Sequence, residues 1–264
     1  MISKVFKLIA YLRYLNKSGT RYSVHSPFVY SLVDNVIRNR TDHTAFDEIK
    51  ALRQKILNKS QLIEITDFGA GSGLKSYEHR FESVASIERK SAVTEKYGRL
   101  LFRLVEHFKP DIIIELGTSL GISTLYLAKA NPGSKVFTIE GCTTISEQAV
   151  NNFNLLNVTN IGLNIGRFDI ILPDVISEAG KLDFAFIDGN HTCQATLSNF
   201  EMLLKIAHND TVFVFDDIHW SSGMEKAWHE ISEHERVTVS IDLFRMGIVF
   251  LKKELSKQKF VIRF

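Results

Sequence analysis

The sequence has few cysteines, prolines and tryptophans, and it has no long apolar run. Its 264 residues include two cysteines, four prolines and two tryptophans. The isolated Cys142 and Cys193 cannot form a disulfide framework or a cysteine-rich metal site, so we expect a reducing, cytoplasmic setting. No run approaches the roughly 18 apolar residues of a membrane-spanning helix, and a signal-peptide pattern is missing, so we predict no transmembrane segment.

An excess of either charge is also missing. The chain has 32 Lys and Arg residues against 30 Asp and Glu residues, which gives a net charge of +2. The basic residues are dispersed along the chain, which argues against a nucleic-acid partner. Hydrophobic residues make up 45% of the chain and charged residues 23%, the composition of an ordinary globular protein.

Residues 1–15 have an amphipathic helical pattern. Basic residues lie between apolar residues that recur at helical spacing, among them Ile2, Val5, Phe6, Ile9 and Leu12. We expect this apolar stripe to pack on the rest of the protein or on a second subunit, which would make a homodimer. Peripheral contact of residues 1–15 with a membrane surface is the alternative.

From about Pro110 onward, short β-branched runs alternate with helical patterns. This alternation is typical of βαβ units around a mostly parallel sheet. The predicted strands are 112–116, 135–139, 161–165, 182–187 and 211–215. The predicted helices are 122–130, 145–156, 170–179, 193–207 and 223–234. Two further runs, 237–242 and 247–251, predict an antiparallel hairpin at the edge of the sheet.

We therefore predict an α/β fold in which residues 110–264 form a doubly wound, Rossmann-like domain. Residues 1–109 are predicted to form a mainly helical N-terminal cap, with helical patches at 28–37 and 46–57. No internal repeat and no low-complexity linker indicates a hinge between independent domains.

Two glycine-containing segments are candidates for a cofactor loop, and their context separates them. In the segment IIIELGTSLGIST, a strand ends at Glu115 and enters a turn that contains Gly117 and Gly121. Such a turn lets the backbone approach a ligand, and the helix that follows points its N-terminal amides at that ligand. Ser123 and Thr124 begin the helix, where their hydroxyls can cap amides or bind a ligand carboxylate.

The next predicted strand supplies a second acid, Glu140, at its end. A carboxylate there can accept hydrogen bonds from both ribose hydroxyls of a nucleoside cofactor. The other segment, ITDFGAGSG at 65–73, has only about eight residues before the next apolar run, too few for a crossover helix. We interpret Gly69, Gly71 and Gly73 as a flexible turn, with a ligand loop as the alternative.

Taken together, the motifs resemble those of a known enzyme family. ELGTSLGIST, FTIEG, GRFDIILPDV, FAFIDGNH and FVFDDIHW occur in this order. With them the chain resembles class I S-adenosylmethionine (SAM)-dependent methyltransferases, most closely the small-molecule O-methyltransferase-like branch. Residues 20–110 and the C-terminal KQKFVIRF are also similar to a bacterial methyltransferase-like family. The resemblance implies a seven-stranded sheet with one antiparallel strand.

The resemblance also implies where the cofactor binds. The methionine moiety would lie over the glycine turn, the ribose on the acid that ends the next strand, and the adenine at the start of a later helix. The residues concerned are Glu115, Gly117, Thr118, Ser119, Gly121, Ser123, Thr124, Glu140, Gly141, Phe168, Asp169 and Asp188. The turn lacks the third glycine of a dinucleotide-binding GxGxxG motif, which argues against an NAD-dependent oxidoreductase.

Three acids follow the predicted strands 182–187 and 211–215. The carboxyl ends of parallel strands share one sheet edge, so Asp188, Asp216 and Asp217 can converge. In the metal-dependent O-methyltransferases that the chain resembles, acids at matching places hold a divalent ion that lowers the pKa of a substrate hydroxyl. By this analogy the three acids are ligands of Mg²⁺ or a similar ion. Other members have no metal, and acids that cap helices or contact cofactor and substrate directly are the alternative.

Histidines and tryptophans accompany these acids. His191 follows Asp188 where some of these enzymes carry a lysine base, and an imidazole with an unperturbed pKa of about 6.5 can accept a hydroxyl proton. His191 and Asp188 are therefore candidate catalytic residues, with a structural loop histidine as the alternative. His219 would position Trp220 or bind metal. Trp220 and Trp228 would line a substrate pocket or pack against helices.

The sequence thus predicts a SAM-dependent methyltransferase that acts on a small-molecule acceptor, with or without a divalent metal. A non-catalytic SAM-binding protein and an NAD-dependent oxidoreductase are the alternatives.

Overall fold

The computed structural model describes residues 4–67 and 78–264, and it divides into two units. One unit is Arg40–Gly180. The other comprises Lys181–Phe264 and the described residues up to Asn39. No helix among the described residues is both long and apolar enough to cross a lipid bilayer.

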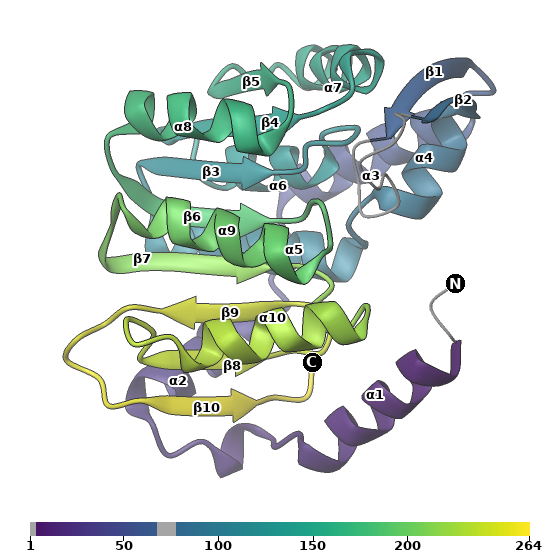
Figure 1. Ribbon diagram of the computed structural model, residues 1–264. Coiled ribbons are helices and arrows are strands. Elements are labelled where there is room, and N and C mark those ends of the chain that lie inside the picture. Colours follow the sequence, from purple (N-terminus) through teal and green to yellow (C-terminus); the bar gives the residue numbers. More distant parts are fainter. Residues whose placement is uncertain (1–3, 68–77) are drawn as a thin grey trace. The chain divides into compact units, whose positions relative to one another are not determined.

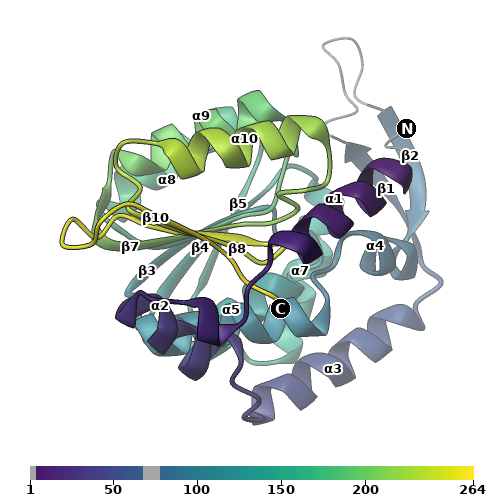
Figure 2. The same ribbon diagram turned by 90° about the horizontal axis from the view of Figure 1, so that it is seen from below.

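The Arg40–Gly180 unit is built around three parallel strands. Its elements are α3 (Thr44–Leu57), β1 (Leu62–Asp67), β2 (Glu78–Ser83), α4 (Val84–Ser91), α5 (Glu95–Phe108), β3 (Ile112–Leu116), α6 (Ile122–Ala130), β4 (Lys135–Glu140), α7 (Thr143–Leu155), β5 (Ile161–Ile165) and α8 (Phe168–Ala179). The strands β3, β4 and β5 are neighbours in that order. Helix α8 covers one face of them, and α6 and α7 lie on the other (Figures 1 and 2).

The apolar composition of β3 and β4 follows from this double cover. Side chains on both faces of these strands are enclosed, so Ile113, Ile114, Val136 and Phe137 are all buried. The predicted strands 112–116 and 161–165 have the observed bounds, and the predicted strand 135–139 extends by one residue to Glu140.

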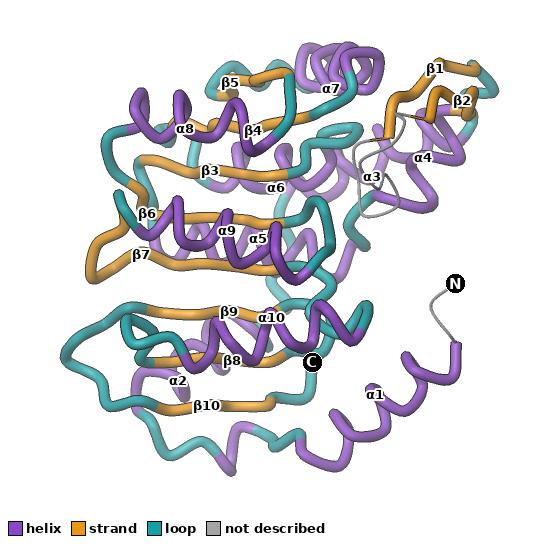
Figure 3. Tube along the Cα trace, in the orientation of Figure 1, coloured by secondary structure: helices purple, strands orange, loops and turns teal. Residues whose placement is uncertain are grey.

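Residues 65–67, the start of the second glycine segment, lie in a strand of a separate small sheet. The strands β1 and β2 pair antiparallel with each other in a two-stranded sheet of their own (Figure 3). Two antiparallel strands need no crossover helix, in agreement with the short spacing in the sequence. The glycines Gly69, Gly71 and Gly73 lie outside the described residues.

Helix α5 was not among the predicted helices. This helix buries a continuous apolar face that includes Leu100, Leu101, Leu104 and Val105. It packs beside α6, and the ring of Tyr126 on α6 lies against Gly98, where an added Cβ would come within 2.2 Å of it.

The other unit holds five strands. Its elements are α1 (Lys4–Lys17), a 3₁₀ turn (Arg21–Ser23), α2 (Pro27–Leu32), a π-helical turn (Val33–Ile37), β6 (Leu182–Ile187), α9 (Cys193–Leu204), β7 (Ala207–Phe215), α10 (Ser222–Glu233), β8 (Val239–Asp242), β9 (Gly247–Phe250) and β10 (Gln258–Val261). The strand order is β10-β8-β9-β7-β6. Helices α9 and α10 cover one face of these strands, and α2 lies on the other (Figure 2).

The predicted hairpin is formed by β8 and β9. Strand β9 runs antiparallel to both β7 and β8, whereas β6 and β7 are parallel. The hairpin does not form the edge of the sheet, because β10 pairs with β8 in parallel register. The short β10 was not among the predicted strands, and it covers backbone groups of β8 that would otherwise form an open edge.

Residues 4–67 and 78–264 contribute eight strands to a mixed, mostly parallel sheet, in addition to the β1–β2 pair. The predicted Rossmann-like α/β fold with one antiparallel strand is confirmed. Strand β10 is the eighth strand, one more than the resemblance implied.

Helix α1 packs through a different face from the predicted one. Its buried residues are Ala10 and Tyr14, and the Tyr14 hydroxyl donates a hydrogen bond of 2.6 Å to the carbonyl of Ile262, just after β10. Of the predicted apolar stripe, Val5, Ile9 and Leu12 are exposed, Phe6 is half-buried and Ile2 lies outside the described residues. Val5, Ile9 and Leu12 do not pack on the rest of the protein, because small and aromatic side chains make that contact instead. Packing of the stripe on a second subunit stays a prediction.

Candidate functional site

The turn after β3 has the backbone geometry of a ligand-binding loop. Three of its residues have positive φ: Gly117 at 105°, Ser119 at 47° and Gly121 at 81°. The amides of Gly117 and Thr118 donate to the carbonyl of Ile139 at 3.1 and 3.3 Å, so the turn is fastened to the end of β4. The turn leads directly into α6, whose N-cap is Gly121.

Glu115 is a buried acid with one unused oxygen. Its Oε2 accepts hydrogen bonds from the hydroxyls of Thr124 at 2.5 Å and Thr138 at 2.7 Å. Its Oε1 is buried and has no hydrogen-bond partner among the described residues. Burial raises the pKa of Glu115 to about 7, although the hydroxyls of Ser123, Thr124 and Thr138 oppose this rise. An unsatisfied buried carboxylate oxygen beside a glycine turn is a place where a cationic or hydrogen-bond-donating ligand fits.

Glu140 holds the same turn from the end of β4. Its Oε2 accepts a hydrogen bond of 2.8 Å from the amide of Ser119, and its Oε1 accepts one of 3.0 Å from the amide of Cys142. The side chain is only partly buried. Each carboxylate oxygen can accept more than one hydrogen bond, so these two backbone contacts are compatible with hydrogen bonds from ligand hydroxyls.

The hydroxyl residues of the turn have internal roles. Thr118 is buried, and its hydroxyl lies 2.6 Å from that of Thr138. Thr124 is fully buried and donates to Glu115, so it orients that acid. Ser123 is buried at the first turn of α6, and Gly141 is half-buried between Glu140 and Cys142.

A contact that the sequence did not suggest lies on the other side of the turn. The hydroxyl of Ser91, the last residue of α4, is 2.8 Å from that of Ser119. The two residues are 28 positions apart, and no local pattern marks a serine at a helix end as a neighbour of the turn. The end of α4 therefore helps to enclose the turn.

Phe168 and Asp169 begin α8, after the end of β5. Phe168 is half-buried, whereas Asp169 is exposed and forms a bidentate pair with Arg167, at 2.7 and 3.0 Å. The hydrogen bonds from Arg167 lower the pKa of Asp169. The glycine turn, Glu140 and this helix start all follow the carboxyl ends of β3, β4 and β5, the edge where open α/β sheets bind ligands.

The acid–base residues predicted after β6 lie close together. His191 Nε2 is 3.6 Å from Asp188 Oδ1, and both side chains are largely enclosed, with exposures of 28% and 13%. Asn190 between them has a positive φ of 49°, which turns the chain sharply ahead of α9. The acid is therefore placed to orient the imidazole.

Asp216 has a partner that the sequence analysis missed. Its carboxylate is fully buried at the end of β7, and Arg245 holds both oxygens. Arg245 Nε lies 3.0 Å from Oδ1, and Nη2 lies 2.7 Å from Oδ2. Arg245 sits in the turn between β8 and β9, 29 residues from Asp216.

Asp217 is surrounded by compensating positive charge. Burial and the neighbouring Asp216 raise its pKa, and the charges of Arg245, His191 and Lys7 act in the opposite direction. Arg245 Nε is 3.7 Å from Asp217 Oδ1, and Asp188 also contributes to the strongly raised pKa of Arg245. The Arg245 guanidinium therefore pairs with Asp216 and Asp217, and it interacts electrostatically with Asp188.

The three acids do not fit a divalent-ion site in this arrangement. A Mg²⁺ ligand presents a free oxygen at about 2.0–2.1 Å from the ion, whereas both oxygens of Asp216 already accept from Arg245. Within the described part of the chain, no three His, Cys, Asp or Glu side chains are grouped as metal ligands. The Arg245 guanidinium already supplies positive charge next to Asp216 and Asp217.

His219 and the two tryptophans have structural partners. The ring nitrogens of His219 lie 3.0 Å from Glu225 Oε1 and 2.8 Å from Asp242 Oδ2, so neither nitrogen is open to a metal. Trp228 is buried, and an added Cβ on Gly247 would lie 2.5 Å from its ring. Trp220 is 40% exposed, and the ammonium of Lys7 lies 3.0 Å from its ring centre.

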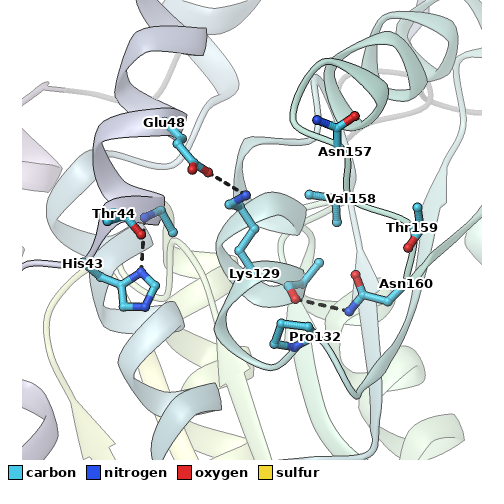
Figure 4. Close-up of a pocket in the computed structure, with 11 residues that line it drawn as sticks. His43, Thr44, Glu48, Lys129, Pro132, Asn157, Val158, Thr159 and Asn160 are labelled. Carbon is cyan, nitrogen blue, oxygen red and sulfur yellow. Dashed lines mark hydrogen bonds and ion pairs between the residues drawn. The ribbon is translucent and has the colours of Figure 1, made fainter.

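A separate pocket of about 260 Å³ lies elsewhere in the Arg40–Gly180 unit. In Figure 4, His43, the N-cap of α3, and Thr44 and Glu48 of α3 face Lys129 and Pro132. Lys129 forms an ion pair with Glu48 at 2.6 Å. Pro132 precedes β4, and the other lining residues include 157–160, which precede β5. The pocket is therefore at the amino ends of these strands, opposite the edge that carries the glycine turn.

Comparison with known proteins agrees with the motifs. Residues 114–218 match the model of a family described as a methyltransferase domain. Curated O-methyltransferases are among the proteins to which the chain is similar. The chain is 28% identical over 130 residues to a catechol O-methyltransferase of Niastella koreensis, a match that covers 48% of this chain and 58% of that protein. A transmembrane O-methyltransferase homolog of Rattus norvegicus is 50% identical over 44 residues, which are 16% of this chain and 17% of that protein. The chain thus spans less than two thirds of the length of these curated relatives.

Solved structures show the same fold. The chain is 18% identical to an O-methyltransferase of Bacillus cereus in complex with SAH, with a TM-score of 0.59 over 83% of this chain and 94% of that one. It is 19% identical to the O-methyltransferase TomG of Streptomyces achromogenes in complex with SAM, with a TM-score of 0.59 over 85% and 95% of the two chains. These likenesses confirm the predicted class I methyltransferase fold.

Proposed function

We propose that this chain transfers the methyl group of SAM to a hydroxyl oxygen of a small-molecule acceptor. The observation that carries the proposal is the buried Oε1 of Glu115, which has no hydrogen-bond partner in the described part of the chain. It lies beside a turn of positive φ that Glu140 holds in place. The family match over residues 114–218 and the O-methyltransferases among the relatives support it. We also propose that residues 110–264 carry the methyltransferase chemistry and that residues 1–109 form an N-terminal extension.

We assign cofactor binding to the carboxyl edge of β3, β4 and β5. When bound, SAM supplies a methyl group that its sulfonium already activates. Glu115 would face the methionine moiety, Glu140 would accept from the ribose hydroxyls, and the start of α8 would border the adenine. The assigned residues are Glu115, Gly117, Thr118, Ser119, Gly121, Ser123, Thr124, Glu140, Gly141, Phe168, Asp169 and Asp188.

We assign proton transfer to His191. Methyl transfer needs the acceptor hydroxyl to lose its proton, and a positioned imidazole can take it. Asp188, 3.6 Å from Nε2, would hold the ring in one orientation and stabilise the imidazolium. No divalent ion is needed to neutralise the neighbouring acids, because Arg245 pairs with Asp216 and lies close to Asp217.

The proposal is tested by isothermal titration with SAM, S-adenosylhomocysteine and NAD. We expect the first two to bind and NAD to give no heat. Glu140→Gln should weaken SAM binding by about tenfold or more. The substitution removes the charge from a hydrogen bond to the ligand, which costs on the order of 1.4 kcal/mol, and this energy corresponds to about a factor of ten in Kd. Glu178→Gln is the matched control, since Glu178 is an exposed acid of the same unit that pairs with Lys135 on the surface.

Two results would end the proposal. One is preferential binding of NAD, and the other is SAM binding that Glu140→Gln and Glu178→Gln leave equally intact. The titration is repeated with EDTA and with Mg²⁺, and we expect the same affinity in both. Circular dichroism of each variant verifies that the fold is retained.

A further inference from the structure

Helix α1 presents an apolar surface on the side that does not pack. Leu8 and Leu12 are each 57% exposed, Ile9 is 43% exposed and Val5 is 61% exposed. The spacing of these four residues, i, i+3, i+4 and i+7, places them on one helical face. We call this face, Val5, Leu8, Ile9 and Leu12, the α1 apolar face.

The helix is held so that this face stays outward. On the opposite side, Ala10 and Tyr14 are buried. The Tyr14 hydroxyl donates to the carbonyl of Ile262 and accepts from the amide of Phe264 at 3.0 Å. Figures 1 and 2 both show α1 beside the chain segment that follows β10. The exposure of the α1 apolar face is therefore set by the docking of the helix.

The charges of α1 have one sign. Its sequence KVFKLIAYLRYLNK contains three lysines and one arginine and no acid. Arg13 stands one helical turn after Ile9, so it borders the α1 apolar face, and Lys17 follows Arg13 by another turn. Both side chains are exposed. Arg13 lies 3.9 Å from Glu225 and its side chain stays 58% exposed, so this long surface ion pair leaves the guanidinium accessible. An apolar strip beside exposed cations of one sign is typical of helices that lie on anionic lipid.

Amphipathic aromatic residues border the other side of the face. Tyr11, one turn after Leu8, is 42% exposed, and its ring packs edge-on against Phe244 at 4.9 Å. Trp220, 40% exposed, lies under the ammonium of Lys7. Tyrosine and tryptophan concentrate at membrane–water interfaces because their rings have an apolar body and a polar edge.

We propose that the α1 apolar face binds the surface of an anionic lipid bilayer. Leu8, Ile9 and Leu12 would enter the boundary between headgroups and acyl chains, while Arg13 and Lys17 would contact the headgroups. A second copy of the chain fits this face less well. In a twofold contact of α1 with α1, the cations of both helices would be brought together, and α1 itself contains no acid that could pair with those of the other helix.

Vesicle flotation of the full chain tests the proposal. Vesicles of phosphatidylcholine alone are compared with vesicles that contain equal parts of phosphatidylcholine and phosphatidylglycerol. We expect binding to the anionic vesicles, and we expect it to weaken as salt shortens the Debye length from about 10 Å at 0.1 M to about 3 Å at 1 M. Binding to neutral vesicles should be at least about tenfold weaker, because each cation near an anionic surface contributes about a fivefold factor.

Variants separate the apolar from the charged contribution. The double variant Leu8→Ser with Leu12→Ser should lose at least about tenfold in binding, because each removes a buried apolar side chain. Leu155→Ser on α7 is the matched control, since Leu155 is also a helical leucine with 57% exposure. Arg13→Gln with Lys17→Gln should weaken binding to anionic vesicles and leave any binding to neutral ones unchanged. All positions are exposed, so thermal unfolding of the variants should match the wild type.

Three results would overturn the proposal. The first is a wild-type chain that does not float with anionic vesicles. The second is equal loss of binding in Leu155→Ser and in the Leu8/Leu12 variant. The third is a wild-type dimer, detected by light scattering without lipid, that the Leu8/Leu12 variant dissociates while vesicle binding is unaffected.

Discussion

Arg245 and Asp216 form a bidentate ion pair in which the carboxylate is fully buried and the guanidinium is 25% exposed. A buried carboxylate is tolerated only when a partner compensates for the lost hydration. Arg245 provides that compensation from the β8–β9 turn, and it also approaches Asp217. The end of β7 and the β8–β9 hairpin are thus joined by charge as well as by the strand ladder.

Arg245→Met should destabilise the protein by about 3–5 kcal/mol, because it leaves the Asp216 carboxylate buried and unpaired. Urea unfolding measures the loss. Arg245→Lys should fall between the wild type and the methionine variant, since an ammonium cannot form the planar two-point contact. Adding Asp216→Asn to Arg245→Met should restore part of the stability. A loss below about 1 kcal/mol in Arg245→Met, the range of exposed ion pairs, would contradict the assigned pairing.

The same pair predicts that Mn²⁺, a substitute for Mg²⁺, does not bind at Asp188, Asp216 and Asp217. Free Mn²⁺ gives an electron paramagnetic resonance signal that is lost on binding. We expect the wild-type protein and Asp216→Asn to leave the same signal. A bound fraction in the wild type that disappears in Asp216→Asn would show that the acids are metal ligands and that Arg245 yields to the ion.

The sequence reveals the acids of this site but not their arginine partner. The acids follow apolar strands directly, so their position at the strand ends was predictable. Arg245 was not, because it stands in the short turn LFRM between two apolar runs, and nothing local connects it with an acid 29 residues earlier. Only the antiparallel pairing of β7 with β9 brings the two together.

Glu115→Gln should change how stability depends on pH. The carboxyl has a pKa of about 7 in the folded chain against an ordinary value of 4.5, because burial penalises its charged form. The folded chain therefore binds this proton more tightly than the unfolded chain, and wild-type stability should fall as pH rises from about 4.5 to about 7. The loss is about 3 kcal/mol at about 1.4 kcal/mol for each unit. Urea unfolding across this range should show a flatter profile for Glu115→Gln, and parallel profiles would contradict the burial effect.

His219 should also stabilise the folded chain more at low pH than at high pH. Here the stabilised form is the positively charged imidazolium, and His219→Asn removes it. Burial lowers the pKa of His219, but hydrogen bonds and charges of Asp242 and Glu225 outweigh it, and the net shift is upward. The stabilisation is then complete below about pH 6.5, the unfolded value, and is lost as pH rises through the raised folded value. The variant should be about 1–3 kcal/mol less stable than the wild type at acidic pH, with a smaller difference at alkaline pH. A difference that stays constant with pH would mean that the charge of His219 is not involved.

The fold was more accessible to prediction than the site. Buried parallel strands are short runs of β-branched and aromatic residues, and β3, β5 and β6 were located to the residue. β10 was missed because its four residues, QKFV, are only partly buried and carry little apolar pattern. The packing face of α1 was mistaken because hydropathy favoured the leucines and isoleucine, whereas Tyr14 makes a specific hydrogen bond with the far end of the chain.

Gly121→Ala should disrupt the glycine turn, and Gly180→Ala should be its control. Both glycines have positive φ, 81° and 67°, so both substitutions carry the backbone cost of about 1–2 kcal/mol. They differ in surroundings: a Cβ on Gly121 would lie 2.3 Å from the Phe153 ring, whereas a Cβ on Gly180 would meet nothing within 4 Å. Thermal unfolding should therefore show a larger loss for Gly121→Ala by about 1–3 kcal/mol, the cost of overpacking.

Cofactor titration of the same pair separates stability from binding. Gly121 is the N-cap of α6, so a displaced turn moves the amides that would face SAM. Gly121→Ala should then weaken SAM binding, while Gly180→Ala, at the end of α8, should not. Phe153→Leu replaces the ring that the new methyl group meets with a smaller side chain. Adding it to Gly121→Ala should recover part of the SAM binding, because it relieves the clash and leaves only the backbone strain. Equal SAM affinity in Gly121→Ala and Gly180→Ala would show that the cofactor does not depend on the shape of this turn.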